Sequence, residues 1–188
     1  YPLDSAGRRP YPLMQNNCAM MVPPRRGVKP SGIWGMLMRY LKTLLILLVG
    51  FWALAGLASN LGGLGMTYEV IRKFTNMPMF PAGEGPPWRT DSTLVIWCGV
   101  AMIMLGKTLT ATLCLGGAFR MARAVRGDSE TFQQAKQWGL LGATAAVGWL
   151  FACFGIFGET IFFMYLDPQG FQVGETAFRY GGYAGLIV

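Results

Sequence analysis

The chain has 188 residues, of which 53% are hydrophobic and only 13% charged, about half the charged share of an ordinary globular protein. This composition predicts a polytopic membrane protein and argues against a soluble domain. The net charge of +7 does not indicate nucleic-acid binding, because the basic residues cluster beside the apolar runs, where topology signals lie. The sequence contains no histidine, which argues against a stand-alone haem, copper or catalytic zinc subunit.

The first thirty-two residues are rich in Pro, Arg and Met, as in "RRPYPLM" and "MVPPRRGVKP". They contain no apolar run of the kind that a signal peptide needs. We therefore predict an extended tail over residues 1–32 that docks on a partner. The chain starts at Tyr1 without a methionine, which we interpret as the product of processing after import into an organelle.

The first apolar run predicts a membrane span over residues 41–61, entered through Arg39 and Lys42. A polar connection follows over residues 66–92. Its first part, "MTYEVIRKFTNM", predicts a short amphipathic helix that turns Tyr68, Ile71 and either Phe74 or Met77 toward the membrane surface. Its second part, "PMFPAGEGPPWRTD", carries four prolines and predicts an irregular loop.

Two further spans are predicted over residues 93–119 and 138–165, with Ser129 as the N-cap of the last helix. The stretch "DPQGFQVGETAF" is interpreted as a loop, and residues 179–188 as a short or incomplete fourth span. The predicted fold class is an all-α membrane protein. It is a small helical bundle with three full transmembrane helices and a short or incomplete fourth.

The basic residues predict the topology of this bundle. Eleven Lys and Arg residues flank one face, in the tail and in the connection between the second and third spans, and only four flank the other. This imbalance places the N-terminus on the cytoplasmic or matrix side. The arginines and lysine nearest to the spans are predicted to contact anionic lipid headgroups such as cardiolipin, unless they act only as topology signals: Arg39, Lys42, Arg120, Arg123 and Arg126.

Lys107 and Glu159 are the ionisable residues that lie well inside the predicted spans. They could serve a proton or ion path, or they could make structural contacts within the bundle or to a neighbouring chain. About 12 Å of depth separates the two positions at 1.5 Å per residue, so a direct ion pair is open but not required. A relay also needs a third group within the spans, and the structural interpretation is therefore preferred.

Other chemistry has little support in the sequence. No catalytic or metal-binding motif occurs, so we predict no enzymatic activity, no metal site and no cofactor other than a bound phospholipid. The cysteines at positions 18, 98, 114 and 153 are interpreted as small core residues. Small residues in the third span predict close helix packing, namely Gly139, Gly142, Gly155 and Gly158.

An ordered set of motifs resembles a known family. The motifs are "RYLKTLLILLVGFWALAGLASN", "WR" at 88–89, "KTLTATLCLGGAFRMARA", "FQQAKQWGLLG", "FGETIFFMY" and "AFR" at 177–179. Together they resemble domain of unknown function 2165, an uncharacterised family of small bacterial integral membrane proteins. The resemblance implies four membrane helices and no particular activity. Glu159 matches the family pattern, whereas Lys107 stands where the family usually has an acidic residue.

These observations predict a non-catalytic accessory subunit of a multi-subunit membrane complex. Its partners would be the other subunits and membrane lipids, and no nucleic acid. The leading host is a mitochondrial respiratory-chain complex or supercomplex in the inner membrane, with the N-terminus in the matrix. A bacterial photosynthetic or respiratory complex is the next choice. A small transporter that uses Lys107 and Glu159 is an alternative, and a quinone- or lipid-binding subunit would show an aromatic cleft near Trp52, Trp149, Phe151 and Phe154.

Overall fold

A computed structural model of the chain describes residues 32–187, so the predicted tail lies outside the described residues. The part that is described is helical and has no strand. Three of its helices are long and apolar enough to cross a membrane, in agreement with the predicted fold class: Ile33–Gly62, Thr93–Ala124 and Ser129–Ile161. Each is longer than its predicted span, since α1 begins eight residues earlier than predicted and polar or basic residues extend the other two helices.

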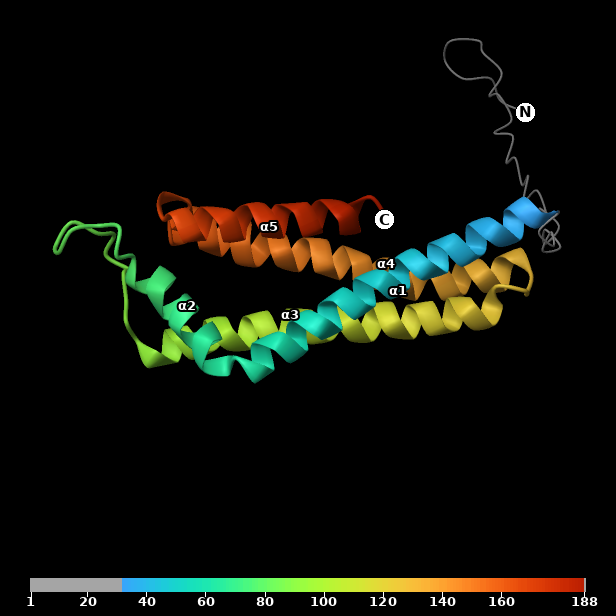
Figure 1. Cartoon of the computed structure of the whole chain (residues 1–188), viewed down its shortest axis with the longest axis horizontal. Helices are drawn as coiled ribbons and strands as arrows, with labels where there is room; N and C mark the ends of the chain where they lie inside the picture. The colour runs from blue at the N-terminus through green and yellow to red at the C-terminus, as the bar shows by residue number, and fades with distance from the viewer. Residues whose placement is uncertain (1–31, 188) are drawn as a thin grey trace, which may run out of the picture.

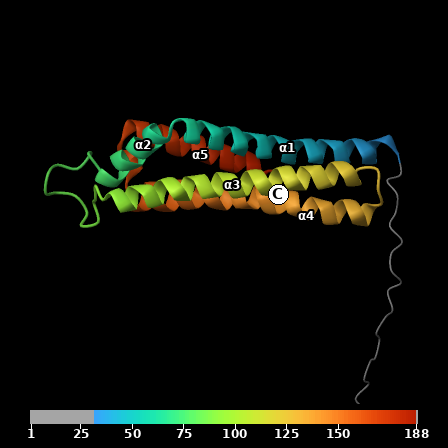
Figure 2. The ribbon, with the colours of Figure 1, turned by 90° about the horizontal axis from the view of Figure 1, so that it is seen from below.

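The first span, α1 (Ile33–Gly62), is separated from α2 (Leu64–Asn76) by Gly63 alone. The second span is α3 (Thr93–Ala124). The third span begins as α4 (Ser129–Leu150) and continues as the π-helix η1 (Phe151–Ile161). A 3-10 turn, η2 (Met164–Leu166), then leads into α5 (Pro168–Gly185). Figures 1 and 2 show α1, α3 and α4 running side by side along the long axis, with α5 folded back along the third span.

The spanning helices pack through glycines that leave no room for a side chain. A Cβ on Gly117 of α3 would contact the backbone of Gly139 in α4, and one on Gly142 would lie 2.6 Å from Cys114 Sγ. Ile46 of α1 fills the space over Gly139, 2.9 Å from where its Cβ would be. Gly139 and Gly142 therefore pack helices as predicted.

The other two predicted packing glycines have more local roles. A Cβ on Gly158 would contact the sulfur of Met164 in η2, the turn that follows its own helix. The three atoms nearest to a Cβ on Gly155 all belong to the ring of Phe151, one turn earlier in the same π-helix. The nearest contact of Gly155 is therefore within its own helix.

Arg39 ties the start of α1 to the connection between α3 and α4. Its guanidinium donates to the carbonyls of Val125 at 3.2 Å and Gly127 at 2.8 Å, and it lies 5.0 Å from the ring centroid of Phe132. Val125 is the C-cap of α3 and Gly127 lies in the connection after it, where carbonyls lack a partner within the helix, so a cation satisfies them well. The contact puts the start of α1 and the α3–α4 connection on one face, as the charge count predicts.

The structure corrects one predicted cap and one predicted loop. The N-cap of α4 is Asp128, whose side chain accepts from Thr131 N, and Ser129 is the first helical residue. The fourth helix begins at Pro168, about three turns before the predicted position. Asp167 caps it by accepting from the backbone N–H groups of Gln169 and Gly170, and Pro168 suits the first helical position.

The amphipathic helix α2 forms where predicted, but its apolar face does not lie on the membrane surface. Phe74 is 8% exposed and Met77, just after the helix, is fully buried. Tyr68 packs against Trp97 of α3, with ring centroids 5.2 Å apart. This face turns into the bundle because η1 and α5 separate from α1 and α3 at this end and leave apolar surface that α2 covers (Figure 1). The loop that follows has no regular structure over residues 77–92, as its prolines predict.

Candidate functional site

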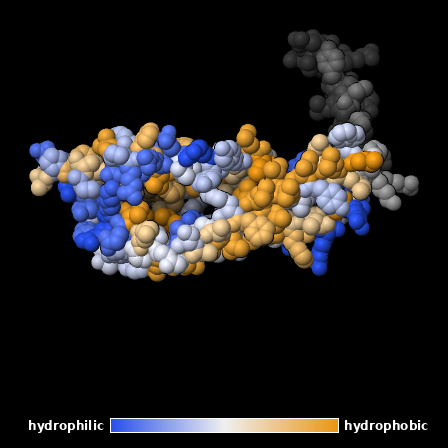
Figure 3. All heavy atoms as spheres, viewed as in Figure 1, coloured by the Kyte–Doolittle hydropathy of each residue, from blue (hydrophilic) through white to orange (hydrophobic). Residues whose placement is uncertain are grey.

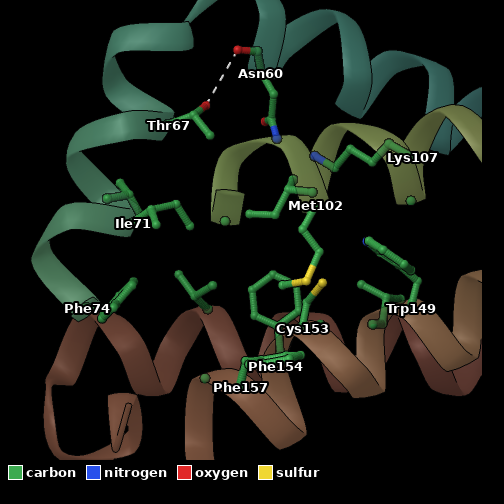
Figure 4. Close-up of a pocket in the computed structure, with 18 of the residues that line it drawn as sticks. Asn60, Thr67, Ile71, Phe74, Met102, Lys107, Trp149, Cys153, Phe154 and Phe157 are labelled. Atoms are coloured by element: carbon green, nitrogen blue, oxygen red, sulfur yellow. Dashed lines mark hydrogen bonds between the residues drawn. The ribbon is translucent and has the colours of Figure 1, made fainter. Parts of the chain in front are cut away.

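Lys107 projects from the middle of α3 toward α1. Its Nζ donates to the backbone carbonyl of Gly56 at 3.1 Å. A Cβ on Gly56 would lie 3.2 Å from Nζ, so the glycine allows this close approach. Asn60, one helical turn further along α1, points its side chain into the same space (Figure 4). A lysine at the centre of a span costs about 3 kcal/mol, and a single neutral carbonyl offsets only part of this.

The space that Lys107 enters is a cavity of about 890 Å³. Helices α1 and α2 form one side of it, and α3, η1 and α5 form the others. Its wall is mainly apolar, with residues such as Ile71, Met102 and Phe157 (Figure 4). Lys107 is the one charged side chain in this wall among residues 32–187. Figure 3 shows the hollow from outside, with an apolar floor and a paler rim.

Aromatic residues line the cavity much as the lipid- or quinone-binding alternative requires. Trp52, Trp149 and Phe154 lie in its wall, and Phe162 and Tyr180 join them. Phe151, the remaining predicted residue, is 57% exposed and is not part of the wall. The aromatic cleft is therefore present, with one of its four predicted members facing outward.

Trp149 is seated against α3 at Gly106, the residue before Lys107. The notch exists because Gly106 has no side chain, and any Cβ there would overlap the indole. The indole Nε1 is covered and has no hydrogen-bond partner within residues 32–187. A buried N–H without an acceptor is unfavourable by about 1–3 kcal/mol, so this wall of the cavity retains an unused donor.

Two contacts bracket the open side of the cavity between α1 and α5. Toward the middle of α1, the rings of Trp52 and Tyr180 lie with their centroids 5.0 Å apart. At the α2 end, Lys73 Nζ lies 3.0 Å from Asp167 Oδ2 and donates to Gln169 Oε1 at 3.0 Å. The hydrogen bond from Lys73 holds the pKa of Asp167 below its usual range. The side of the bundle between these contacts gives access to the cavity.

Glu159 does not meet Lys107. It faces α5 beside Gly174, where a Cβ would lie 3.0 Å from its Oε1. It lines a second hollow together with Glu175 and Arg179, apart from the Lys107 cavity. The two predicted intramembrane polar residues thus belong to separate sites, and the acceptor that Lys107 finds within the described chain is a carbonyl.

The predicted lipid-contact residues divide into two groups. Arg39 is 8% exposed and its guanidinium is taken up by carbonyls, so its predicted headgroup contact is replaced by a structural one. Lys42 and Arg126 are exposed. Arg120 and Arg123 stack on Trp138 and Phe119 at 4.5 Å and 4.4 Å from the ring centroids. Lipid contact at these four residues stays a prediction.

Several site residues carry signals that the sequence analysis did not use. Gly56 and Asn60 stand four apart and so share a face of α1, and Gly106 directly precedes the lysine. The tie between Lys73 and Asp167 joins residues far apart in the sequence and leaves no local signal. The three cysteines within the described range are free, and no cluster there has the residues to hold a metal ion.

Comparison with known proteins agrees with this architecture. A family model described as a predicted small integral membrane protein, domain of unknown function 2165, matches residues 38–188. No curated protein and no solved structure matches the chain. The match covers the helices apart from the first turn of α1 and leaves out the N-terminal tail, as the ordered motifs predict. The chain therefore belongs to the family of predicted small integral membrane proteins called domain of unknown function 2165.

Proposed function

We propose that this protein is a non-catalytic membrane subunit that binds a lipid-like amphiphile in the cavity between α1 and α5. The observation that carries the proposal is the cavity itself. It is large, mainly apolar and lined by aromatic rings, and it lies within the spanning part of the bundle with an open side. Sites of this volume and character hold small apolar molecules with a few polar groups.

The wider proposal is that the protein is an accessory subunit of a larger membrane assembly. In the most apolar window of α1, only 17% of residues are buried within the chain, so most of this surface is free for lipid or for helices of other subunits. We propose a mitochondrial respiratory-chain complex as the host, with a bacterial photosynthetic or respiratory complex as the alternative. The basic extension that precedes a bacterial-type membrane domain supports this choice.

The geometry favours binding over transport. A relay between Lys107 and Glu159 would need a polar connection between them, and the two residues line separate hollows. The wall around Lys107 is apolar and aromatic, as expected for a site that retains a hydrophobic molecule.

Purification from native membranes in a mild detergent tests both parts of the proposal. We expect the protein to migrate on a native gel with other subunits and to release a stoichiometric amphiphile on solvent extraction, detected by mass spectrometry. Migration alone at low mass would contradict the subunit role. Extraction of no amphiphile beyond the annular lipid mixture would contradict the binding role.

A further inference from the structure

The cavity carries one positive charge and no negative one. Lys107 is the one ionisable side chain with a formal charge in the part of its wall formed by residues 32–187, and Asp and Glu are absent from that part. Other polar groups there, such as Asn60 and Gln172, are neutral. A buried ammonium is stable when it is paired and hydrogen-bonded, and Lys107 has one carbonyl contact within its own chain. The wall therefore complements a ligand with a single negative charge.

The cavity volume indicates how much of the ligand the bundle can enclose. At about 30 Å³ for each heavy atom, the share that a water molecule takes in the liquid, 890 Å³ holds roughly 30 such atoms. A single-chain amphiphile fits within this volume. A phospholipid with two acyl chains and a headgroup exceeds it and would extend through the open side.

The distribution of polar groups sets the orientation of the ligand. Lys107 and Asn60 form a polar corner beside the Gly56 carbonyl. From this corner the wall continues through Met102 and Phe154, which offer only apolar surface (Figure 4). A head at the corner and a chain along this wall would satisfy both parts of the cavity.

We infer that the cavity is a site for a single-chain amphiphile with a carboxylate head, and that Lys107 binds the carboxylate. The inference rests on the proposed function, since it assumes that the cavity binds an amphiphile. It adds the charge of the head group, the number of acyl chains and the residue that binds the head group, Lys107. The carboxylate accepts from Lys107 Nζ, which keeps its hydrogen bond to Gly56.

Native mass spectrometry of the full chain in a neutral detergent tests this assignment. The protein is titrated separately with hexadecanoate and with methyl hexadecanoate, which has the same chain and no charge. We expect the carboxylate to bind about tenfold or more tightly than the ester, because a hydrogen bond to a charged group is stronger than one to a neutral group.

Substitutions of Lys107 assign the preference to this residue. In Lys107→Met the preference for the carboxylate should disappear while the ester binds within about threefold of the wild type, which also shows that the cavity is intact. Lys107→Arg should keep most of the preference. Lys42→Met is the matched control, because Lys42 is exposed on α1 and outside the cavity wall, and it should behave as the wild type.

The outcomes separate this inference from the proposed function. Equal binding of acid and ester by the wild type overturns the carboxylate assignment and leaves amphiphile binding standing. A preference that survives in Lys107→Met overturns the role of Lys107. Binding of a neutral quinone analogue in place of both probes, unaffected by Lys107→Met, also overturns the assignment. Binding of no probe at all overturns the proposed function together with this inference.

Discussion

At the end of the bundle where α1 begins, the spanning helices touch through backbone, whereas toward α2 they are separated by a cavity. In the first region Gly117, Gly139 and Gly142 bring α3 and α4 together, and Arg39 fastens α1 to the connection between them. In the second region η1 has separated from α1 and α3, and rings and long side chains line the remaining space. We call the contacts among Gly117, Gly139 and Gly142 the seam. The chain thus combines a closely packed seam with a cavity whose lining can move. A larger side chain should therefore destabilise the seam strongly and the cavity region only slightly.

Enlarging a glycine of the seam should have the largest effect. In Gly117→Leu the new side chain meets the backbone of Gly139, which cannot move without separating α3 from α4. We expect a loss of about 3 kcal/mol of unfolding free energy, at the upper end of the cost of overpacking. Unfolding by SDS titration in mixed micelles measures it.

Gly116→Leu is the control for this substitution. A Cβ at Gly116 has no neighbour within 4 Å, so the stability should stay near that of the wild type. Equal losses in the two variants would contradict a seam formed at Gly117 and would indicate a general effect of leucine at this level of α3.

Removing the hydrogen bonds of Arg39 to the α3–α4 connection should have the next largest effect on stability. Arg39→Leu leaves the carbonyls of Val125 and Gly127 without their donor, and a hydrogen bond to a charged group contributes about 1.5–3 kcal/mol. We expect a loss of about 2 kcal/mol in the same SDS titration, less than two full bonds, because Gly127 is only partly buried and water can replace the donor there. Lys42→Leu, on the same helix but exposed, should change the stability little. Equal stability of the two variants would contradict a stabilising role of the Arg39 hydrogen bonds.

A side chain at Gly106 should affect binding more than stability. Any Cβ there displaces the Trp149 indole, but here a cavity lies beside the ring and can receive it. We expect Gly106→Ala to lose about 1 kcal/mol or less, to shift the tryptophan fluorescence and to weaken amphiphile binding several-fold. Gly148→Ala, with no neighbour within 4 Å of the new methyl group, is the control. A stability loss as large as that of Gly117→Leu would show that this region is as rigid as the seam.

The smallest effect is expected at the tie between α2 and α5. The Lys73 hydrogen bond lowers the pKa of Asp167 in the folded state, so the contribution of the pair is present above the unfolded value of about 3.9. It is lost as the pH falls through the lower folded pKa. Asp167→Asn removes the charge and keeps a good N-cap.

We expect this variant to lose less than about 1 kcal/mol at neutral pH, because Lys73 is partly exposed. The difference from the wild type should vanish at acidic pH, as measured by thermal unfolding between pH 7 and pH 3. Asp91→Asn, which breaks an exposed pair with Arg72 away from α5, controls for the general loss of a carboxylate. A difference that grows as the pH falls would contradict the sign of the Asp167 shift.

The spans could be predicted because each depends on a local property. A run of apolar residues must satisfy its backbone as a helix in lipid, and the lysines and arginines beside it mark its ends. The seam was half predicted, since the glycines of the third span show close packing but do not name the partner helix. The cavity could not be predicted, because it results from where η1 separates from α1 and α3. The prediction that the apolar face of α2 lies on the membrane surface was wrong, because an amphipathic pattern does not show which apolar surface will cover that face.

The partner of Lys107 shows the same limit at a single residue. The sequence identifies the lysine as buried and in need of an acceptor, and its depth allows no certain ion pair. The acceptor in the structure is a main-chain carbonyl, at Gly56, which has no side chain to mark it in a sequence. Backbone acceptors of this kind become visible only when the crossing point of two helices is known.

The π-helical stretch Phe151–Ile161 has a consequence for how this family can change in length. Its hydrogen bonds join residues five apart, as between Phe162 N and Phe157 O at 2.9 Å, so it holds an additional residue in the turn that faces the cavity. A deletion of one residue here would return a wide turn to ordinary α-helix, so the residues after it would keep nearly their present direction. Glu159 and the start of α5 would then keep their present neighbours. Relatives with one residue fewer in this stretch should therefore differ only in the local wall of the cavity while keeping the seam intact.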